Sequence, residues 1–317
     1  VFSVISDSII PPALPFHNKE LLKNESLHLA CNSQILMIRL EQRIRKRINH
    51  MTPLSAKKLF LFDIDGTIAV GDTLYPGTRP MLDYIQSIGG KAYYITNNST
   101  KSSADYVKKF RDVFGLETSR EQFITSGYMT MRHLRQHHAW DKIFVLGTAS
   151  YIASLRSAGL YITESPDANV QCVVAAYDDE LTYQKLVNTC KLLSTMDIPF
   201  YATNPDLCCP VDFGFIPDCG AICQMLTAST GQTPRYLGKP NPKVVSLCQA
   251  DSGFRDDQTL VVGDRLYTDI ACGINSKVDT CVLYTGEATP EEVAHTQYKP
   301  TYAFSDIQEL LDACRQS

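Results

Sequence analysis

Short, continuous apolar runs alternate with helical patterns along most of the chain. The run at 59–62 (Leu-Phe-Leu-Phe) ends in a carboxylate, as expected of a strand buried on both faces of a parallel sheet. Further β-rich runs occur at 91–95, 259–262 and 279–283, and the last helical pattern, Ser305 to Cys314, predicts a helix with Ser305 as its N-cap. The alternation predicts an α/β core built on a doubly wound, Rossmann-like parallel sheet, with ligands at the carboxyl ends of its strands.

A second alternation of the same kind lies inside the first. The chain between Asn98 and Lys239 is too long for a single crossover. It contains the patterns of strand 142–146, helix 149–158, strand 170–176, helix 182–193 and strand 199–203. We therefore predict an inserted α/β cap domain at 124–234 and a core domain made of 51–123 and 235–317.

The first fifty residues differ from the rest. They carry seven Lys/Arg and four Asp/Glu, a net of +3, which leaves −7 of the total of −4 for the remainder. The apolar and basic stretch at 35–47 could form an amphipathic helix, so a membrane-surface or targeting segment stays open. We favour the interpretation that 1–50 is a poorly ordered N-terminal extension upstream of a natural start at Met51.

Composition narrows the class of protein. The 317 residues are 44% apolar and 20% charged, as in a soluble globular protein of about two domains. No segment approaches the roughly 18 apolar residues of a membrane span, and the net negative charge argues against a nucleic-acid partner. Eleven scattered cysteines are typical of buried thiols in a reducing cytosol, so we expect a cytoplasmic protein without a membrane partner.

Polar clusters stand at four predicted strand ends, and the first is the segment 63–67 (Asp-Ile-Asp-Gly-Thr). Asp63 and Asp65 lie two residues apart just past a strand and point to the same side. One carboxylate could attack phosphorus while the other handles the proton of the leaving group. Because two close carboxylates repel each other, the pair needs a cation, and Mg²⁺ prefers oxygen ligands and bridges to phosphate. Taken alone, the segment could also be a strand ending in a capped turn.

The other three clusters add donors, a cation and further carboxylates. They are Thr96-Asn97-Asn98-Ser99-Thr100, Gly238-Lys239-Pro240 and the segment from Gly263-Asp264 to Asp269. Singly, these could be a helix N-cap, a solvated loop lysine and a turn. Together they would place hydroxyl and amide donors, an ammonium and two carboxylates at the edge where parallel strands end. Their joint occurrence at one sheet edge favours a phosphate-handling site.

The ordered set of motifs resembles the haloacid dehalogenase superfamily over residues 57–315. More narrowly, it is similar to the branch with a large C2-type cap, which includes 4-nitrophenylphosphatases, pyridoxal phosphatases, phosphoglycolate phosphatases and ribonucleotide monophosphatases. The resemblance implies that Asp63 is the nucleophile of an aspartyl-phosphate intermediate and that Asp65 is the general acid and base. It implies Mg²⁺ bound by the Asp63 carboxylate, the Asp65 backbone carbonyl and Asp264, with Asp269 in support.

The same resemblance assigns the remaining site residues. Thr96, Asn97 and Lys239 would bind the phosphoryl oxygens of a small phosphorylated metabolite, and the resemblance also allows a homodimer. In the cap, the segment 203–206 (Thr-Asn-Pro-Asp) ends a strand, so Asn204 and Asp206 could face the leaving group, although such a segment also forms plain turns.

Three alternatives to a phosphatase remain. A phosphotransferase or mutase of the same superfamily would share every core residue. A response-regulator receiver also uses acidic residues with a Thr and a Lys, but it lacks the Gly-Thr after the second Asp and has no inserted cap. A catalytically idle phosphate-binding scaffold would be expected to lose at least one catalytic group, and this sequence keeps them all.

Overall fold

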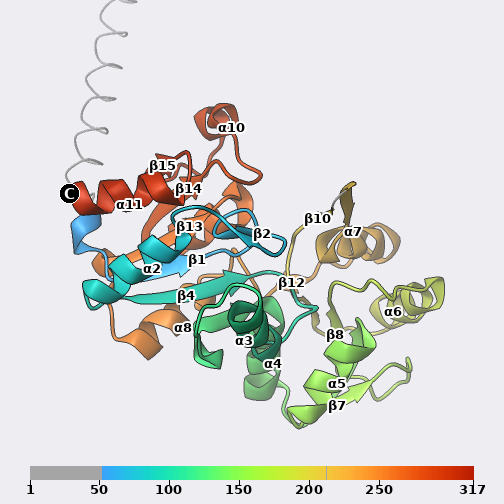
Figure 1. Cartoon of the computed structure of the whole chain (residues 1–317). Helices are drawn as coiled ribbons and strands as arrows, with labels where there is room; N and C mark the ends of the chain where they lie inside the picture. Colours follow the sequence, from blue (N-terminus) through green and yellow to red (C-terminus); the bar gives the residue numbers. More distant parts are fainter. Residues whose placement is uncertain (1–51, 212) are drawn as a thin grey trace, which may run out of the picture. The chain divides into compact units, whose positions relative to one another are not determined.

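The computed structural model describes residues 52–211 and 213–317, which fold around two separate parallel sheets (Figure 1). The N-terminal extension predicted at 1–50 lies outside the described residues. In the part of the chain that the structure describes, no helix is both long enough and apolar enough to cross a membrane.

The first sheet has the strand order β15-β14-β13-β1-β4-β5, and every neighbouring pair is parallel. Its strands are β1 (Leu59–Phe62), β4 (Lys91–Thr96), β5 (Phe123–Thr125), β13 (Thr259–Gly263), β14 (Asp279–Leu283) and β15 (Tyr302–Phe304). From β1 the chain adds β4 and β5 on one side, and later β13, β14 and β15 on the other. Such a reversal leaves a crevice beyond the carboxyl ends of the two central strands, where ligands bind. The predicted doubly wound core is confirmed.

Side chains of β1 alternate between two apolar clusters, one on each face of this sheet. Phe60 lies in a cluster with side chains of α2 (Thr78–Ser87) and α11 (Ile307–Gln316). Leu61 lies in a cluster with side chains of α8 (Lys243–Ser252). Because helices cover both faces, all four residues of β1 are buried, which explains why its sequence is a continuous apolar run.

The C-terminal helix α11 starts later than predicted, because its N-cap is Asp306 and not Ser305. The Asp306 carboxylate accepts a hydrogen bond from the backbone N–H of Glu309 at 2.9 Å. Ser305 donates its own backbone N–H to the Glu309 carboxylate at 2.7 Å. Ser305 therefore lies one residue before the N-cap, and its backbone N–H is bonded to the Glu309 side chain in the first turn of the helix.

The second sheet has the strand order β12-β9-β8-β6-β7 and is also parallel throughout. Its strands are β6 (Lys142–Leu146), β7 (Tyr161–Thr163), β8 (Cys172–Ala175), β9 (Phe200–Ala202) and β12 (Arg235–Tyr236). Its helices are α5 (Ala149–Ser157), α6 (Tyr183–Thr195) and α7 (Cys219–Thr230). We call this second α/β layer the cap and the first the core.

Both predicted boundaries of the cap shift by a few residues. β5 (123–125) pairs with β4 in the core sheet, although residues 124 and 125 were assigned to the cap. β12 pairs with β9 in the cap sheet, although Arg235 and Tyr236 were assigned to the core. Very short strands carry little periodicity, so the sequence alone could not assign them to a sheet.

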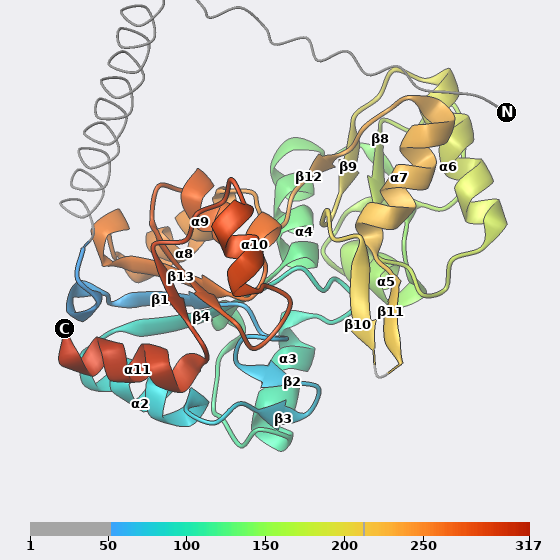
Figure 2. The ribbon, with the colours of Figure 1, turned by 90° about the horizontal axis from the view of Figure 1, so that it is seen from above.

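The two layers are joined by chain segments that belong to both. Helix α4 (Ser126–His137) contributes Met129 to a core cluster and Leu134 to a cap cluster, and Figure 2 shows α4 and β12 between the two layers. The further helices are α3 (Ser103–Asp112), α9 (Ala271–Asn275) and α10 (Pro290–His295), with short helical turns at Leu54–Ala56, Arg120–Gln122, Asp256–Gln258 and Leu266–Ile270.

Two antiparallel hairpins complete the described structure. One, β2 (Ala69–Val70) with β3 (Thr73–Leu74), follows the end of β1. The other, β10 (Cys208–Val211) with β11 (Gly214–Pro217), follows β9 in the cap. Residues of both hairpins line the cavity that contains the site described next.

Candidate active site

Asp63 and Asp65 stand directly after β1, at the predicted crevice. The Asp63 backbone N–H donates to the Val262 carbonyl of β13 at 2.9 Å, so β1 and β13 together fix its position. The Asp63 side chain is largely buried, whereas Asp65 is exposed. Both residues line one cavity of about 700 Å³. The pair predicted from the sequence therefore has one shielded and one solvent-accessible carboxylate.

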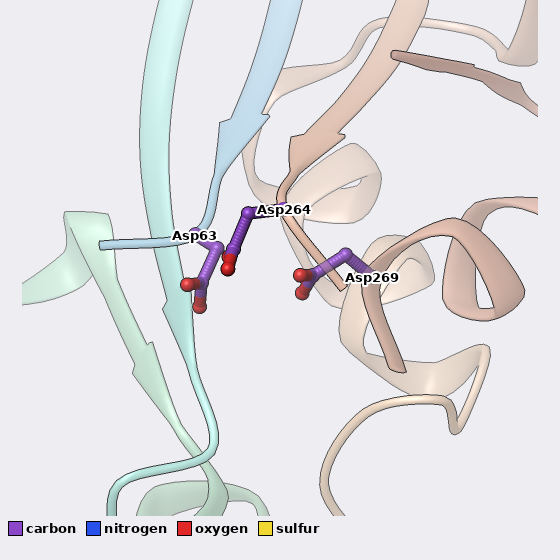
Figure 3. Close-up of side chains that lie close together, drawn as sticks. All are labelled: Asp63, Asp264 and Asp269. Atoms are coloured by element: carbon purple, nitrogen blue, oxygen red, sulfur yellow. The ribbon is translucent and has the colours of Figure 1, made fainter. Parts of the chain in front are cut away.

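Three carboxylates meet at this end of the sheet, and two of them, Asp63 and Asp264, line the cavity. Asp63, Asp264 and Asp269 each offer an oxygen within 4.8 Å of the others, and all three residues are buried (Figure 3). Asp264 follows β13, and Asp269 lies in the helical turn after it. Asp269, predicted as a supporting residue, is a full member of the cluster. The Asp65 side chain is not among these three carboxylates, which agrees with the predicted use of its backbone carbonyl as a ligand but does not test it.

Lys239 is the cation of the cluster. Its Nζ lies 2.5 Å from Asp63 Oδ1 and 2.6 Å from Asp269 Oδ1, and the side chain is buried. Burial alone would lower the pKa of the ammonium, but the two carboxylates raise it above its ordinary value. Lys239 therefore stays charged and fixes one oxygen of Asp63.

One ammonium does not balance three buried carboxylates. Burial raises the pKa of Asp63 to about 6; Lys239 opposes this shift and Asp264 adds to it. Burial and the neighbouring Asp269 raise the pKa of Asp264 to about 6. Burial likewise raises the pKa of Asp269 to about 6, against the effect of Lys239. The cluster has more negative than positive charge, and its carboxylates offer hard oxygen donors, which fits a small divalent cation such as Mg²⁺.

Asp264 is held by the first strand-end segment, 63–67, and by Glu287, which the strand-end pattern did not include. Thr67 Oγ1 donates to Asp264 Oδ1 at 3.3 Å, and the backbone N–H of Glu287 donates to Oδ2 at 2.8 Å. Gly66 has a φ of 87°, and a Cβ there would lie 2.6 Å from Asp264 Oδ2. Gly66 thus has two reasons to be glycine, a left-handed backbone and the close approach of a carboxylate.

The phosphoryl-binding residues predicted after β4, Thr96 and Asn97, differ in how far the protein itself bonds their side chains. Thr96 is buried and lines the cavity, and its Oγ1 accepts the Asn98 backbone N–H at 3.1 Å. Asn97 is used by the protein itself: its Nδ2 donates to Asp206 at 2.7 Å and to the Lys239 carbonyl at 3.0 Å. Its Oδ1 accepts the Lys239 backbone N–H at 2.9 Å. Both ends of the Asn97 side-chain amide are therefore bonded to protein groups.

The two cap residues predicted to face the leaving group are both buried. Asn204 is fully buried and donates to Asp206 at 2.9 Å and to Asp218 at 3.0 Å. Asp206 borders the cavity and accepts from Arg265 of the core at 2.6 Å. Arg265 was missed as a site residue, although it stands inside the motif between Asp264 and Asp269. Its position between two motif carboxylates was the sequence signal that could have identified it as a site residue.

The rest of the cavity wall comes from the cap and from the rim of the core. The cap contributes Tyr177, Phe215 and Asp218, and the core rim contributes Lys101 and Lys109. Aromatic, acidic and basic side chains of the wall leave room beyond the carboxylate cluster for the organic part of a small ligand.

Comparisons with known proteins agree with this geometry. Residues 60–161 match a family model described as haloacid dehalogenase-like hydrolase, and residues 236–310 match one described as HAD-hydrolase-like. An acid sugar phosphatase of Staphylococcus aureus (strain MRSA252) is 33% identical over 258 residues, covering 80% of this chain and 96% of that protein.

Solved structures give the same result. The crystal structure of a 4-nitrophenylphosphatase from Thermotoga maritima is 35% identical with a TM-score of 0.77, covering 82% of this chain and 98% of that one. A p-nitrophenyl phosphatase from Archaeoglobus fulgidus is 28% identical with a TM-score of 0.74, covering 81% and 99%. The chain belongs to the haloacid dehalogenase-like hydrolases, on the branch of phosphatases that carry a cap domain.

Proposed function

We propose that this hydrolase is a magnesium-dependent phosphatase that cleaves a small phosphomonoester through an aspartyl-phosphate on Asp63. One observation carries the proposal: the buried Asp63 carboxylate has one oxygen held by Lys239 at 2.5 Å and lines a cavity of about 700 Å³. A carboxylate fixed in this way is oriented for attack on a phosphorus atom in the cavity.

The reaction uses the two carboxylates in sequence. An oxygen of Asp63 forms a bond to phosphorus, the bond from phosphorus to the leaving oxygen breaks, and Asp65 gives that oxygen a proton. Asp65 then takes a proton from a water molecule whose oxygen attacks the same phosphorus. Inorganic phosphate leaves and the Asp63 carboxylate is regenerated. The exposure of Asp65 suits a group that exchanges protons with alcohol and water in turn.

The surrounding residues hold the phosphoryl group. Lys239 and Thr96 line the same cavity as Asp63, and their ammonium and hydroxyl would supply donors to phosphoryl oxygens. Asn97 would contribute its backbone N–H, because its side-chain amide is bonded to Asp206 and Lys239.

Asp63, Asp264 and Asp269 would hold magnesium, with the backbone carbonyl of Asp65 as a further ligand. When bound, the cation would neutralise charge on the phosphoryl oxygens. The support from this chain is the excess of buried carboxylate over ammonium in the cluster.

The identity of the ester is proposed only as a class. Relatives are named for sugar phosphates and for 4-nitrophenyl phosphate, which supports a phosphomonoester with a small organic group. The cavity beyond the carboxylates, with Phe215 and Tyr177 on the cap side, suits a leaving group of that size.

The test measures release of inorganic phosphate from a panel of sugar phosphates and 4-nitrophenyl phosphate, with magnesium and after chelation. Asp63→Asn should form no phosphoenzyme, whereas Asp65→Asn should still become phosphorylated by 4-nitrophenyl phosphate, whose leaving group needs no proton. Turnover by Asp63→Asn would remove Asp63 from the nucleophile's role, and turnover after exhaustive chelation would exclude the metal. Transfer to an added alcohol in preference to water would favour a phosphotransferase, and phosphate binding without turnover an idle scaffold.

A further inference from the structure

The carboxylate of Asp206 belongs to the cap but bonds to the core at two places. Its Oδ2 accepts from Nδ2 of Asn97 at 2.7 Å, and its Oδ1 accepts from Nη1 of Arg265 at 2.6 Å. Within the cap, Asn204 Nδ2 also donates to Oδ2 at 2.9 Å. Asp206 is 1% exposed, so these bonds are shielded from water.

The ion pair between Asp206 and Arg265 is costly to separate. The Arg265 side chain is 17% exposed, and its Nε also lies 3.0 Å from a carboxylate oxygen of Glu287. Removing one partner of a buried pair leaves an uncompensated charge, which is strongly destabilising. The pair therefore favours the arrangement in which the cap loop rests on the core beside Asp264.

Asn97 links Asp206 to Lys239, which in turn contacts the nucleophile Asp63. Its amide has a donor end and an acceptor end, and the acceptor Oδ1 receives the Lys239 backbone N–H at 2.9 Å. The donor Nδ2 bonds to the Asp206 carboxylate and to the Lys239 carbonyl. Asp206 thus fixes which way the amide points, the amide fixes the backbone of Lys239, and the Lys239 ammonium contacts Asp63.

Two glycines show how closely the segments meet. The Gly238 N–H donates to the Thr203 carbonyl at 2.7 Å, and a Cβ on Gly238 would lie 2.6 Å from both that carbonyl and Asn97 Oδ1. The Gly220 N–H donates to the Asp206 carbonyl at 2.7 Å, and a Cβ on Gly220 would clash with the Pro205 carbonyl. No side chain fits at either point, so the cap loop lies directly on the core segment at Gly238 and, within the cap, directly on α7 at Gly220.

We propose that Asp206 is a positioning residue that couples the placement of the cap to the placement of Lys239 and hence of the nucleophile Asp63. Asp206 touches neither phosphorus nor the leaving group in this role. Its catalytic consequence rests on the proposed phosphatase function, whereas its structural consequence does not.

Hydrogen exchange tests the structural part without any substrate. Asp206→Asn keeps the size of the side chain but cannot accept from Asn97, Asn204 and Arg265 together. The control is Asp178→Asn, since Asp178 is a buried cap carboxylate paired with Lys185 at 2.8 Å entirely within the cap. Exchange of the Gly238 and Lys239 amides, read from a peptide spanning 235–241, should be about tenfold or more faster in Asp206→Asn and unchanged in Asp178→Asn.

Kinetics test the catalytic part. With 4-nitrophenyl phosphate, Asp206→Asn should lower kcat about tenfold or more and change KM less than about threefold, while Asp178→Asn keeps kcat within about twofold of wild type. If Asp206→Asn does not fold, Arg265→Lys keeps a cation but loses the second donor, and it should give intermediate changes in both exchange and kcat.

The outcomes are separable. Equal exchange at 235–241 in the two Asp→Asn variants overturns the proposal, and so does faster exchange with unchanged kcat. A wild-type protein that hydrolyses no phosphomonoester overturns the proposed function instead, while the exchange comparison still decides whether Asp206 holds Lys239.

Discussion

The Lys239 ammonium lies 2.5 Å from Oδ1 of Asp63, and both side chains are buried. The contact joins residues 176 positions apart, at the ends of separate segments of the core. It orients the nucleophile that we propose and offsets part of the charge of the carboxylate cluster. Asp63 needs a neighbouring cation, because its carboxylate lies beside two other buried carboxylates.

Replacing Lys239 by Met should remove most turnover from the molecules that fold, and it should also lower the unfolding midpoint, because two buried carboxylates lose their partner. Met keeps the length of the side chain but leaves Asp63 and Asp269 without their shared donor, so we expect a loss in kcat of about a thousandfold, comparable to losing an electrostatic donor at an active site. Lys57→Met is the matched control, since Lys57 is a buried core lysine paired with Asp279 at 2.5 Å. It should lower the unfolding midpoint without a comparable loss of kcat per folded molecule, and equal kinetic losses would contradict the assignment.

Magnesium should raise the unfolding midpoint more at neutral than at acid pH. The pKa values of Asp63, Asp264 and Asp269 are raised to about 6, so the folded metal-free protein binds protons more readily than the unfolded chain. These groups therefore destabilise the metal-free fold above about pH 6, and the destabilisation is relieved as pH falls toward about 4. Magnesium must compete with those protons.

The measurement is the difference in unfolding midpoint with and without magnesium, taken between about pH 7.5 and pH 5. The difference should shrink as pH falls, and Asp264→Asn should show little difference at either pH. If magnesium raised the wild-type unfolding midpoint equally at both pH values, the cation would not bind at these carboxylates.

Thr67→Val should weaken magnesium binding through Asp264. The Thr67 hydroxyl donates to Asp264 at 3.3 Å in a buried position, and losing one such bond costs about 1 kcal/mol, or roughly a fivefold weaker affinity. Thr78→Val is the control, because the buried Thr78 hydroxyl donates instead to the Ile68 carbonyl at 2.9 Å. Titration by calorimetry should show the loss in the first variant and not in the second; the opposite order would argue that Thr67 does not orient the ligand.

Much of the core could be predicted from the sequence because its determinants are local. The run at 59–62 followed by Asp63 fixed a buried strand, its direction and the carboxylate at its end, and the other strand-end clusters follow the same rule. The predicted domain boundary divides the short strand at 123–125, because three residues show no usable period. Asn97 could not be assigned its bonds either, since its partner Asp206 lies 109 positions away and meets it only through the placement of the cap.

A chain that begins at Met51 should match the full chain in turnover and in unfolding midpoint. Every site residue and both sheets lie in the part of the chain from residue 52 onward that the structure describes. The compared acid sugar phosphatase aligns over 258 residues that cover 96% of its own length. A clear loss in either quantity would show that residues 1–50 contribute to the domain.

Substrate choice should respond to the cap residues that line the cavity and not to Asn204. Phe215 stands on β11, is 65% exposed and lines the cavity, whereas the Asn204 side chain is fully buried against Asp206 and Asp218. Phe215→Ala removes apolar surface next to the leaving group, so it should change the ratio of kcat/KM between a sugar phosphate and 4-nitrophenyl phosphate by about tenfold, or about 1.4 kcal/mol.

Comparing Asn204→Ala with Phe215→Ala shows which part of the cap selects the substrate. Asn204→Ala removes two buried hydrogen bonds that hold Asp206 and Asp218, so kcat/KM should fall by a similar factor for every ester, together with the unfolding midpoint. Phe213→Ala is a further control, since Phe213 is 84% exposed on the same hairpin and does not line the cavity. If Asn204→Ala changed the ratio while Phe215→Ala did not, the loop at 203–206 would face the leaving group during turnover.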